Sequence, residues 1–141
     1  MNKKTIWVGF SVMAGVLVLG AADVKVDVAK LPPAAAKTGV TFDTDIKPMF
    51  DKSCAKCHGA DVEKPKGKFR ADTKANVLKG GGDGVAVTPG DLAKSPLIAM
   101  VAQIVDDEDL FMPPKGNKAK IAPLTKDEVG LVRAWIEQGA K

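Results

Sequence analysis

The length and charge of the chain limit what it can be. Its 141 residues hold one small domain at most. The formal net charge is +4, and it falls to +2 if residues 1–22 are removed, because Lys3 and Lys4 go with them and no acid does. A domain so close to neutrality gives no reason to expect nucleic acid or an anionic membrane surface as its partner.

The first 22 residues have the pattern of a secretory signal peptide. A short basic stretch is followed by an uncharged apolar run from Ile6 to Leu19 and then by the small residues Gly20, Ala21 and Ala22. The alternative is a retained membrane anchor, but the apolar run is shorter than the ~20 residues of a spanning helix. We therefore expect cleavage after Ala22, a periplasmic or secreted protein, and no stable membrane insertion unless the segment is retained.

Residues 23–41 differ in composition from the rest of the chain. They contain Leu31-Pro32-Pro33 and Ala34-Ala35-Ala36 among alternating Lys and Asp residues. Such a stretch predicts an extended linker, or a strap that lies along the domain. The compact domain is expected to begin near Phe42 and to comprise residues 42–141.

A first helix is predicted from Asp43 or Thr44, either of which can cap it. Apolar residues recur every four positions at Ile46, Phe50 and Cys54, and Pro48 falls in the first turn, where proline is tolerated. This helix leads directly into the most informative stretch of the chain.

That stretch is Cys54-Ala55-Lys56-Cys57-His58, which contains both cysteines and the one histidine. A Cys-x-x-Cys-His run is typical of c-type haem attachment: two thiols about one helical turn apart form thioethers to the porphyrin, and the adjacent imidazole ligates the iron. The alternatives are a redox-active Cys-x-x-Cys pair, half of a zinc site, or a disulfide. Zinc lacks a fourth ligand, no strand precedes Cys54 for a redox motif, and a disulfide leaves His58 unexplained.

Three further helices are predicted downstream, separated by Gly- and Pro-rich loops. Asp72 can cap a short helix that ends at Gly80, and Ser95-Pro96 can begin another, with an apolar stripe of Leu97, Val101, Ile104 and Val105. Thr125 to Glu128 form a capping box before a helix containing Val129, Val132, Trp135 and Ile136. No alternating pattern predicts a strand. The fold class is therefore all-α, with about four helices and long loops.

The second iron ligand cannot be a histidine of this chain, because His58 is the only one. Methionine is the usual alternative. Met49 is too close in sequence to reach the opposite haem face easily, and Met100 has the helical spacing of a core residue. Met112 is favoured because Phe111-Met112-Pro113-Pro114 lies in a loop that prolines can stiffen. The alternative for Met112 is an apolar residue that packs on the core.

Taken together, these motifs resemble the planctomycete-type cytochrome c domain. The resemblance covers about Asp45 to Ala140 and is carried by Cys54 to Gly59, Lys66 to Asp72, Gly80 to Gly84, Pro89 to Asp91, Ser95 to Leu97, Met112 to Pro114 and Trp135 to Ala140. It implies a small cytochrome c fold with one covalent haem c, axial His58 and an axial methionine that matches Met112. Ala71 stands where that family usually carries leucine.

The expected function is electron transfer between redox partner proteins by a monomer that is not an enzyme. Arg70 is a candidate for a propionate contact, although a solvated surface arginine is an equal alternative. Peroxidase-like chemistry would need a distal acid or base, and the chain has no second histidine for it. A haem-based sensor, or a docking and electron-entry module of a larger oxidoreductase, remains a further alternative.

Overall fold

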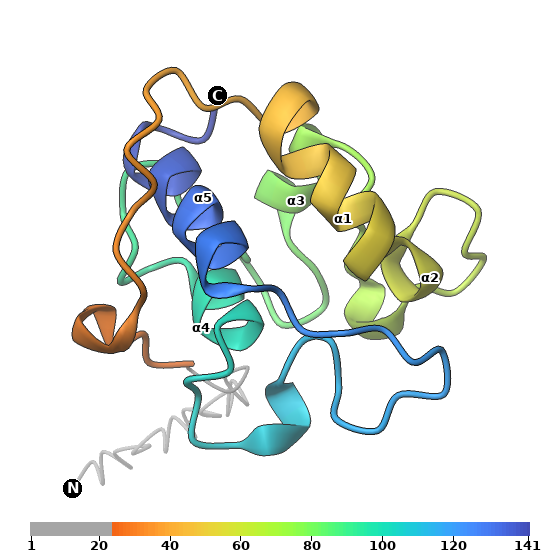
Figure 1. The fold of residues 1–141 in the computed structure, drawn as a ribbon. Helices are drawn as coiled ribbons and strands as arrows, with labels where there is room; N and C mark the ends of the chain where they lie inside the picture. The colour runs from red at the N-terminus through yellow and green to blue at the C-terminus, as the bar shows by residue number, and fades with distance from the viewer. Residues whose placement is uncertain (1–23) are drawn as a thin grey trace, which may run out of the picture.

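The computed structural model describes residues 24–141, which form an all-α domain with long connecting loops (Figure 1). No β-strand occurs within this range, only two isolated bridges. The five α-helices are α1 (Lys47–Ser53), α2 (Ala55–His58), α3 (Lys74–Lys79), α4 (Pro96–Val101) and α5 (Lys126–Glu137). A π-helical turn, η2 (Phe42–Ile46), leads into α1, and shorter 3-10 turns are η1 (Val28–Lys30), η3 (Lys66–Lys68) and η4 (Glu108–Leu110).

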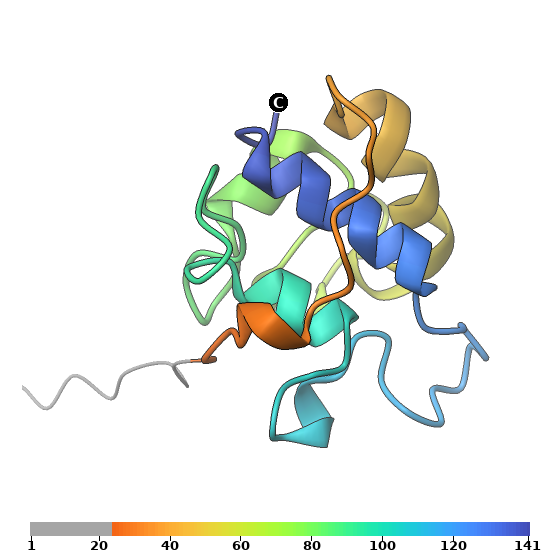
Figure 2. The ribbon, with the colours of Figure 1, turned by 60° about the vertical axis from the view of Figure 1, so that its left-hand side comes forward.

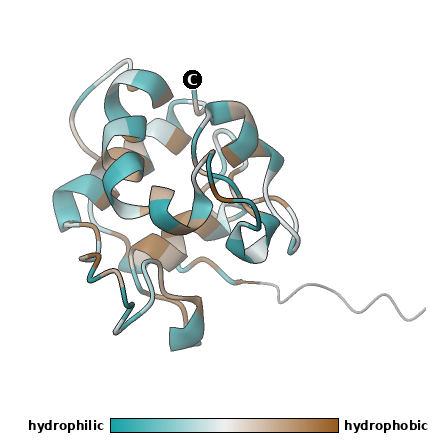
Figure 3. Ribbon diagram, turned by 90° about the vertical axis from the view of Figure 1, so that its right-hand side faces the viewer, coloured by the Kyte–Doolittle hydropathy of each residue, from teal (hydrophilic) through white to brown (hydrophobic). Residues whose placement is uncertain are grey.

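The core forms where α5 packs against η2 and α4. Trp135 of α5 is fully buried, with its ring 5.7 Å from that of Phe42, and Phe42 meets Phe50 edge-on at 6.0 Å. Hydrophobic and hydrophilic residues alternate along the helices (Figure 3), as expected of helices that bury one face. The predicted face of α5 is confirmed, because Val129, Val132, Trp135 and Ile136 are all buried.

The sequence predicts one helix that leads into the cysteine motif, whereas the structure has two helices there, α1 and α2. The chain bends at Cys54, which has φ −119° and separates α1 from α2. Pro48 lies in the first turn of α1, as predicted. Neither Asp43 nor Thr44 caps the segment; instead Asp45 accepts a hydrogen bond from the Thr41 backbone N–H at 2.9 Å and pairs with Lys37.

The other predicted helix ends are right in part. The capping box is confirmed, since Glu128 N donates to Thr125 Oγ1 at 3.2 Å and Thr125 N donates to the Glu128 carboxylate at 2.7 Å. The cap of α3 is Thr73 and not Asp72, because Thr73 Oγ1 accepts from Asn76 N at 3.2 Å. Helix α4 ends at Val101, so the Ile104 and Val105 positions lie beyond it.

Residues 24–41 lie along α5 as a strap (Figure 2). Val26, Leu31 and Val40 are buried, and Ala35 N donates to Gly130 O at 2.9 Å. Further along α5, Arg133 donates to a strap carbonyl oxygen, that of Pro32, at 3.0 Å. The hydrophobic core therefore extends N-terminal of Phe42.

The predicted signal peptide, residues 1–22, lies outside the described residues. Within residues 24–141, no helix has both the length and the apolar character needed to cross a membrane.

Candidate functional site

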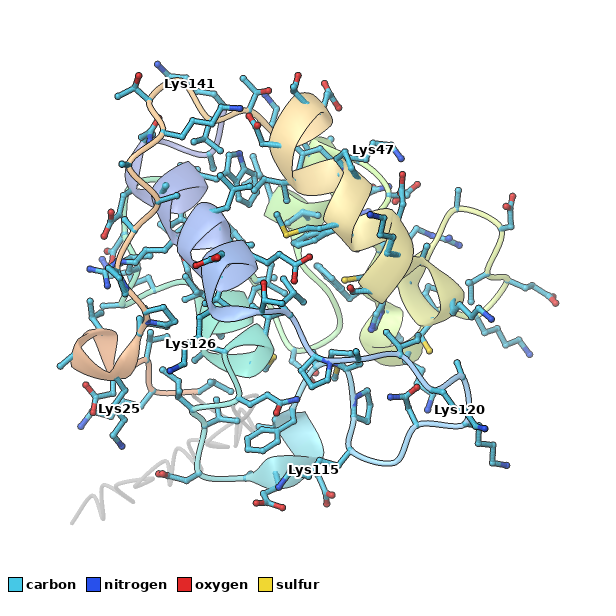
Figure 4. The ribbon with its side chains drawn as sticks, in the orientation of Figure 1. Lys25, Lys47, Lys115, Lys120, Lys126 and Lys141 are labelled. Carbon is cyan, nitrogen blue, oxygen red and sulfur yellow. The ribbon has the colours of Figure 1, made fainter. Side chains whose placement is uncertain are left out.

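A cavity of about 510 Å³ opens between α2 and the loop from Met112 to Leu124. One wall consists of residues from the end of α1 and from α2, and the other consists of residues of the loop, which carries Lys115 and Lys120 (Figure 4). Val101 of α4 and Lys66 complete the lining. The cavity brings together four residues predicted from the sequence: Cys54, Cys57, His58 and Met112.

Both thiols are free and half-buried in the α2 wall. Burial, with smaller contributions from the nearby Asp51 carboxylate and from Cys57, raises the pKa of the Cys54 thiol to about 12. A redox-active Cys-x-x-Cys motif needs the opposite, a thiol whose pKa lies below its ordinary value so that the thiolate can attack. The raised pKa of Cys54 therefore disfavours the redox-pair alternative.

The imidazole of His58 is held by a backbone carbonyl. Its Nδ1 lies 3.1 Å from Phe69 O, and because a carbonyl oxygen only accepts, Nδ1 is the protonated nitrogen. Nε2 therefore keeps its lone pair. Burial lowers the pKa of His58, while the bond to Phe69 acts in the opposite direction. The ring is thus neutral at pH 7, which is the form that ligates a metal.

Of the three methionines in the described residues, Met112 alone lines the cavity. Met49 is buried in the core, and Met100 is half-buried on α4. The backbone around Met112 is fixed on one side by its own N–H, which donates to Met100 O at 3.1 Å. The competing interpretations of Met49 and Met100 as ligands therefore receive no support from the position of either side chain.

Asn117 is a site residue that the sequence analysis missed. Its side chain donates to Pro114 O at 3.0 Å and Ile121 O at 2.9 Å and accepts from Ile121 N at 2.8 Å. These bonds close the turn after Met112 and keep the second wall in place. The only sequence signal was the Gly116-Asn117 pair, which is typical of a turn.

Arg70 does not line the cavity. Its guanidinium donates to the carbonyl oxygens of Gly59 at 2.6 Å, Ala60 at 3.0 Å and Val62 at 2.9 Å. The lysines that do line the cavity are Lys56, Lys66 and Lys118.

The residues of this cavity fit a covalent haem. Its volume is within the 300–1,000 Å³ typical of ligand sites, and its lining includes apolar side chains such as Val101, Ile121 and Leu124. Cys54, Cys57 and His58 belong to one wall, and Met112 belongs to the loop that forms the other. No cluster of three or more His, Cys, Asp or Glu side chains suited to a metal ion occurs in residues 24–141.

Comparison with known proteins agrees with this chemistry. Residues 54–116 match the family model described as Planctomycete cytochrome C. The match begins at the first thiol and includes Met112, whereas the strap and α5 lie outside it. No curated protein and no solved structure matches the chain. The stretch from residue 54 to residue 116 is thus a domain of the planctomycete cytochrome c family, a family of haem-binding electron-transfer proteins.

Proposed function

We propose that this protein is an exported monohaem c-type cytochrome that carries electrons, with one haem c bound through Cys54 and Cys57 and its iron ligated by His58 and Met112. The observation that carries the proposal is that one cavity is lined by all four residues, the thiols and imidazole on one wall and the thioether on the other. Met/His ligation is also the arrangement that raises a haem reduction potential.

Each wall of the cavity has a separate task in this proposal. A bound haem supplies the one-electron chemistry. His58 offers the neutral Nε2, because Nδ1 is committed to Phe69 O. Met112 offers a sulfur from a loop held by Asn117, and the apolar lining keeps water away from the ligands. Ligands fixed on two packed walls stay in place on a change of oxidation state, which favours fast electron transfer over substrate chemistry.

Charge around the cavity supports a protein partner with an acidic surface. Residues 51–70 and 112–124, which include nearly the whole lining, contain nine Lys and Arg residues against three Asp and Glu residues. The remaining described residues contain ten against thirteen. The net charge of the protein is therefore near zero although the segments that form the cavity are positively charged. Complementary negative charge on a redox partner would speed the encounter of the two proteins.

Export is part of the proposal because the sequence of residues 1–22 has the three regions of a secretory signal. Attachment of haem to a Cys-x-x-Cys-His motif is likewise expected outside the cytoplasm. The periplasm, or secretion from the cell, is the expected destination.

Absorption spectra of purified holoprotein test the ligand assignment. We expect low-spin haem in the wild type, with a methionine-to-iron charge-transfer band in the oxidised form. Met112→Ala should lose this band. Met100→Ala is the matched control, because Met100 is the neighbouring methionine whose carbonyl binds Met112 N yet whose side chain does not line the cavity.

The opposite pattern would refute the assignment: a band that persists in Met112→Ala and disappears in Met100→Ala. Covalent attachment is tested on the same samples, since haem should stay with the denatured wild-type chain and be lost from the Cys54→Ala, Cys57→Ala double variant. A wild type without covalent haem, after expression with a competent maturation system, would refute the proposal as a whole.

A further inference from the structure

Arg70 lies outside the cavity, yet it holds the turn that follows His58. Its two terminal nitrogens donate to three carbonyl oxygens of that turn, those of Gly59, Ala60 and Val62, at 2.6 to 3.0 Å. A guanidinium can serve several acceptors at once because its donors form a rigid planar fork. The turn is therefore tied to the backbone at residue 70.

The same backbone contacts His58 on both sides of Arg70. Phe69 O accepts the Nδ1 proton at 3.1 Å, and Ala71 N donates to His58 O at 2.8 Å. The Phe69 ring also meets the imidazole edge-on, with centroids 5.3 Å apart. The position of residues 69–71 thus sets the position and the hydrogen bond of the imidazole.

Besides the bond from Ala71 N to His58 O, two anchors hold the segment from residue 66 to residue 71. At its start, Gly82 N donates to Gly67 O at 2.7 Å. Nearer to the imidazole, the side chain of Arg70 ties the segment to the turn at Gly59 to Val62. Loss of the Arg70 contacts would leave the Phe69 carbonyl supported only by the Gly67 anchor and by the single bond from Ala71 N to His58 O.

We propose that Arg70 is a positioning residue for His58: it keeps the Phe69 carbonyl against Nδ1 and so controls how much electron density the imidazole offers to iron. This inference rests on the proposed ligation by His58. A strong Nδ1–H···O bond makes Nε2 a better donor, which stabilises the oxidised iron and lowers the reduction potential. Weakening that bond should raise the potential.

The test is Arg70→Lys, which keeps the positive charge but cannot reach three carbonyls with one ammonium. Arg70→Gln is less suitable, because loss of a positive charge by itself lowers the potential and would mask the effect. In the holoprotein of Arg70→Lys we expect a higher reduction potential by redox titration. We also expect faster solvent exchange of the His58 Nδ1 proton by NMR of the reduced form.

Arg133→Lys is the matched control. Arg133 is also half-buried and also donates to a backbone carbonyl, that of Pro32 at 3.0 Å, but it does so on α5 against the strap. Its replacement should leave both the potential and the exchange rate at their wild-type values.

The proposal is wrong if Arg70→Lys keeps the wild-type potential and exchange rate, even when its thermal stability falls. If Arg70→Lys binds no haem, the test is made on the wild-type protein by NMR. The His58 Nδ1 proton and the Arg70 guanidinium protons should then exchange with solvent through the same local opening. Independent exchange of the two would refute the inference. A failure of the proposed function can be distinguished from a failure of this inference, because in that case the wild-type protein itself would lack haem or coordination by His58.

Discussion

The two ring nitrogens of His58 have different surroundings, and the backbone creates the difference. Nδ1 donates to Phe69 O, whereas Nε2 belongs to a side chain that lines the cavity. This asymmetry fixes one tautomer before any ligand arrives, so little reorganisation is needed for metal binding. Burial contributes as well, because it lowers the pKa of the imidazole and keeps it neutral.

The lowered pKa of His58 predicts how stability depends on pH. The unfolded chain takes up the His58 proton near pH 6.5, whereas the folded protein takes it up only at lower pH. Acid therefore favours the unfolded chain, and the free energy of unfolding should fall as pH drops below about 6.5. Iron ligation by the same imidazole would act in the same direction.

Guanidinium unfolding of the holoprotein between pH 7.5 and pH 5 measures this dependence. Asp45→Asn is the control, because Lys37 holds the pKa of Asp45 below its usual value and its carboxyl therefore titrates at more acidic pH. Between pH 7.5 and pH 5, the free energy of unfolding of Asp45→Asn should change with pH as it does in the wild type. A free energy of unfolding that stays constant down to pH 5 would contradict the account of His58.

At the residue scale, the sequence could predict the residues of the candidate site but not the hydrogen bonds that hold them in place. Cys54, Cys57 and His58 lie within five consecutive positions, and Met112 was marked by the prolines that follow it. The partner of Nδ1 is a main-chain oxygen eleven residues away, and every residue has one, so no side-chain pattern can reveal it. Arg70 was a candidate for either a propionate contact or a solvated surface position, but its contacts are set by the fold of the turn after His58.

At the scale of elements, the packing of the strap on α5 depends on a close approach of the two backbones at Gly130. The position of a Cβ on Gly130 would lie 2.6 Å from Pro33 O, closer than real Cβ contacts permit. Glycine therefore lets the strap reach the α5 backbone and form the bond from Ala35 N to Gly130 O. This contact keeps Val26, Leu31 and Val40 on the core.

Gly130→Ala should destabilise the protein, although alanine is the better helix former by about 1 kcal/mol. Overpacking against a backbone oxygen costs about 1–3 kcal/mol, and loss of the Ala35 hydrogen bond costs about 1 kcal/mol more, so the net effect is unfavourable. Thermal unfolding of the holoprotein measures it. Lys126→Ala, at an exposed position of the same helix, should change little. A Gly130→Ala variant more stable than the wild type would contradict this description of the strap.

The elements that the sequence predicted well have local causes. The capping box at Thr125 to Glu128 needs only neighbouring residues, and it is present as predicted. The start of α4 is right in position, since Ser95 is the N-cap residue and Pro96 follows it, but the Ser95 side chain makes no capping hydrogen bond. Its buried hydroxyl instead accepts from Thr88 N at 2.9 Å and donates to Asp91 O at 2.7 Å. Such tertiary hydrogen bonds compete with capping and leave no periodic signal.

At the scale of the whole molecule, the uneven charge predicts salt-dependent electron exchange with anions. Ferricyanide, a small anionic oxidant, should oxidise the reduced holoprotein more slowly as salt is added, because screening weakens its attraction to the positive cavity face. Lys118→Glu, at a residue lining the cavity, should lower the low-salt rate by a factor of a few. Stopped-flow absorbance measures both.

Lys74→Glu makes the same charge change on α3, away from the cavity lining, and should have the smaller effect. Equal effects of the two variants would mean that net charge matters and its position does not. A rate that does not depend on salt would rule out a functional positive face.

The central claim is that the iron has protein ligands from both walls of the cavity and therefore serves electron transfer. The most direct measurement is the absorption spectrum of reduced wild-type protein before and after addition of carbon monoxide. With Met112 bound from a loop fixed by Asn117, we predict a low-spin spectrum that carbon monoxide leaves unchanged. Immediate conversion to a carbon monoxide complex would contradict the claim, because it would show an open or labile position suited to sensing or catalysis.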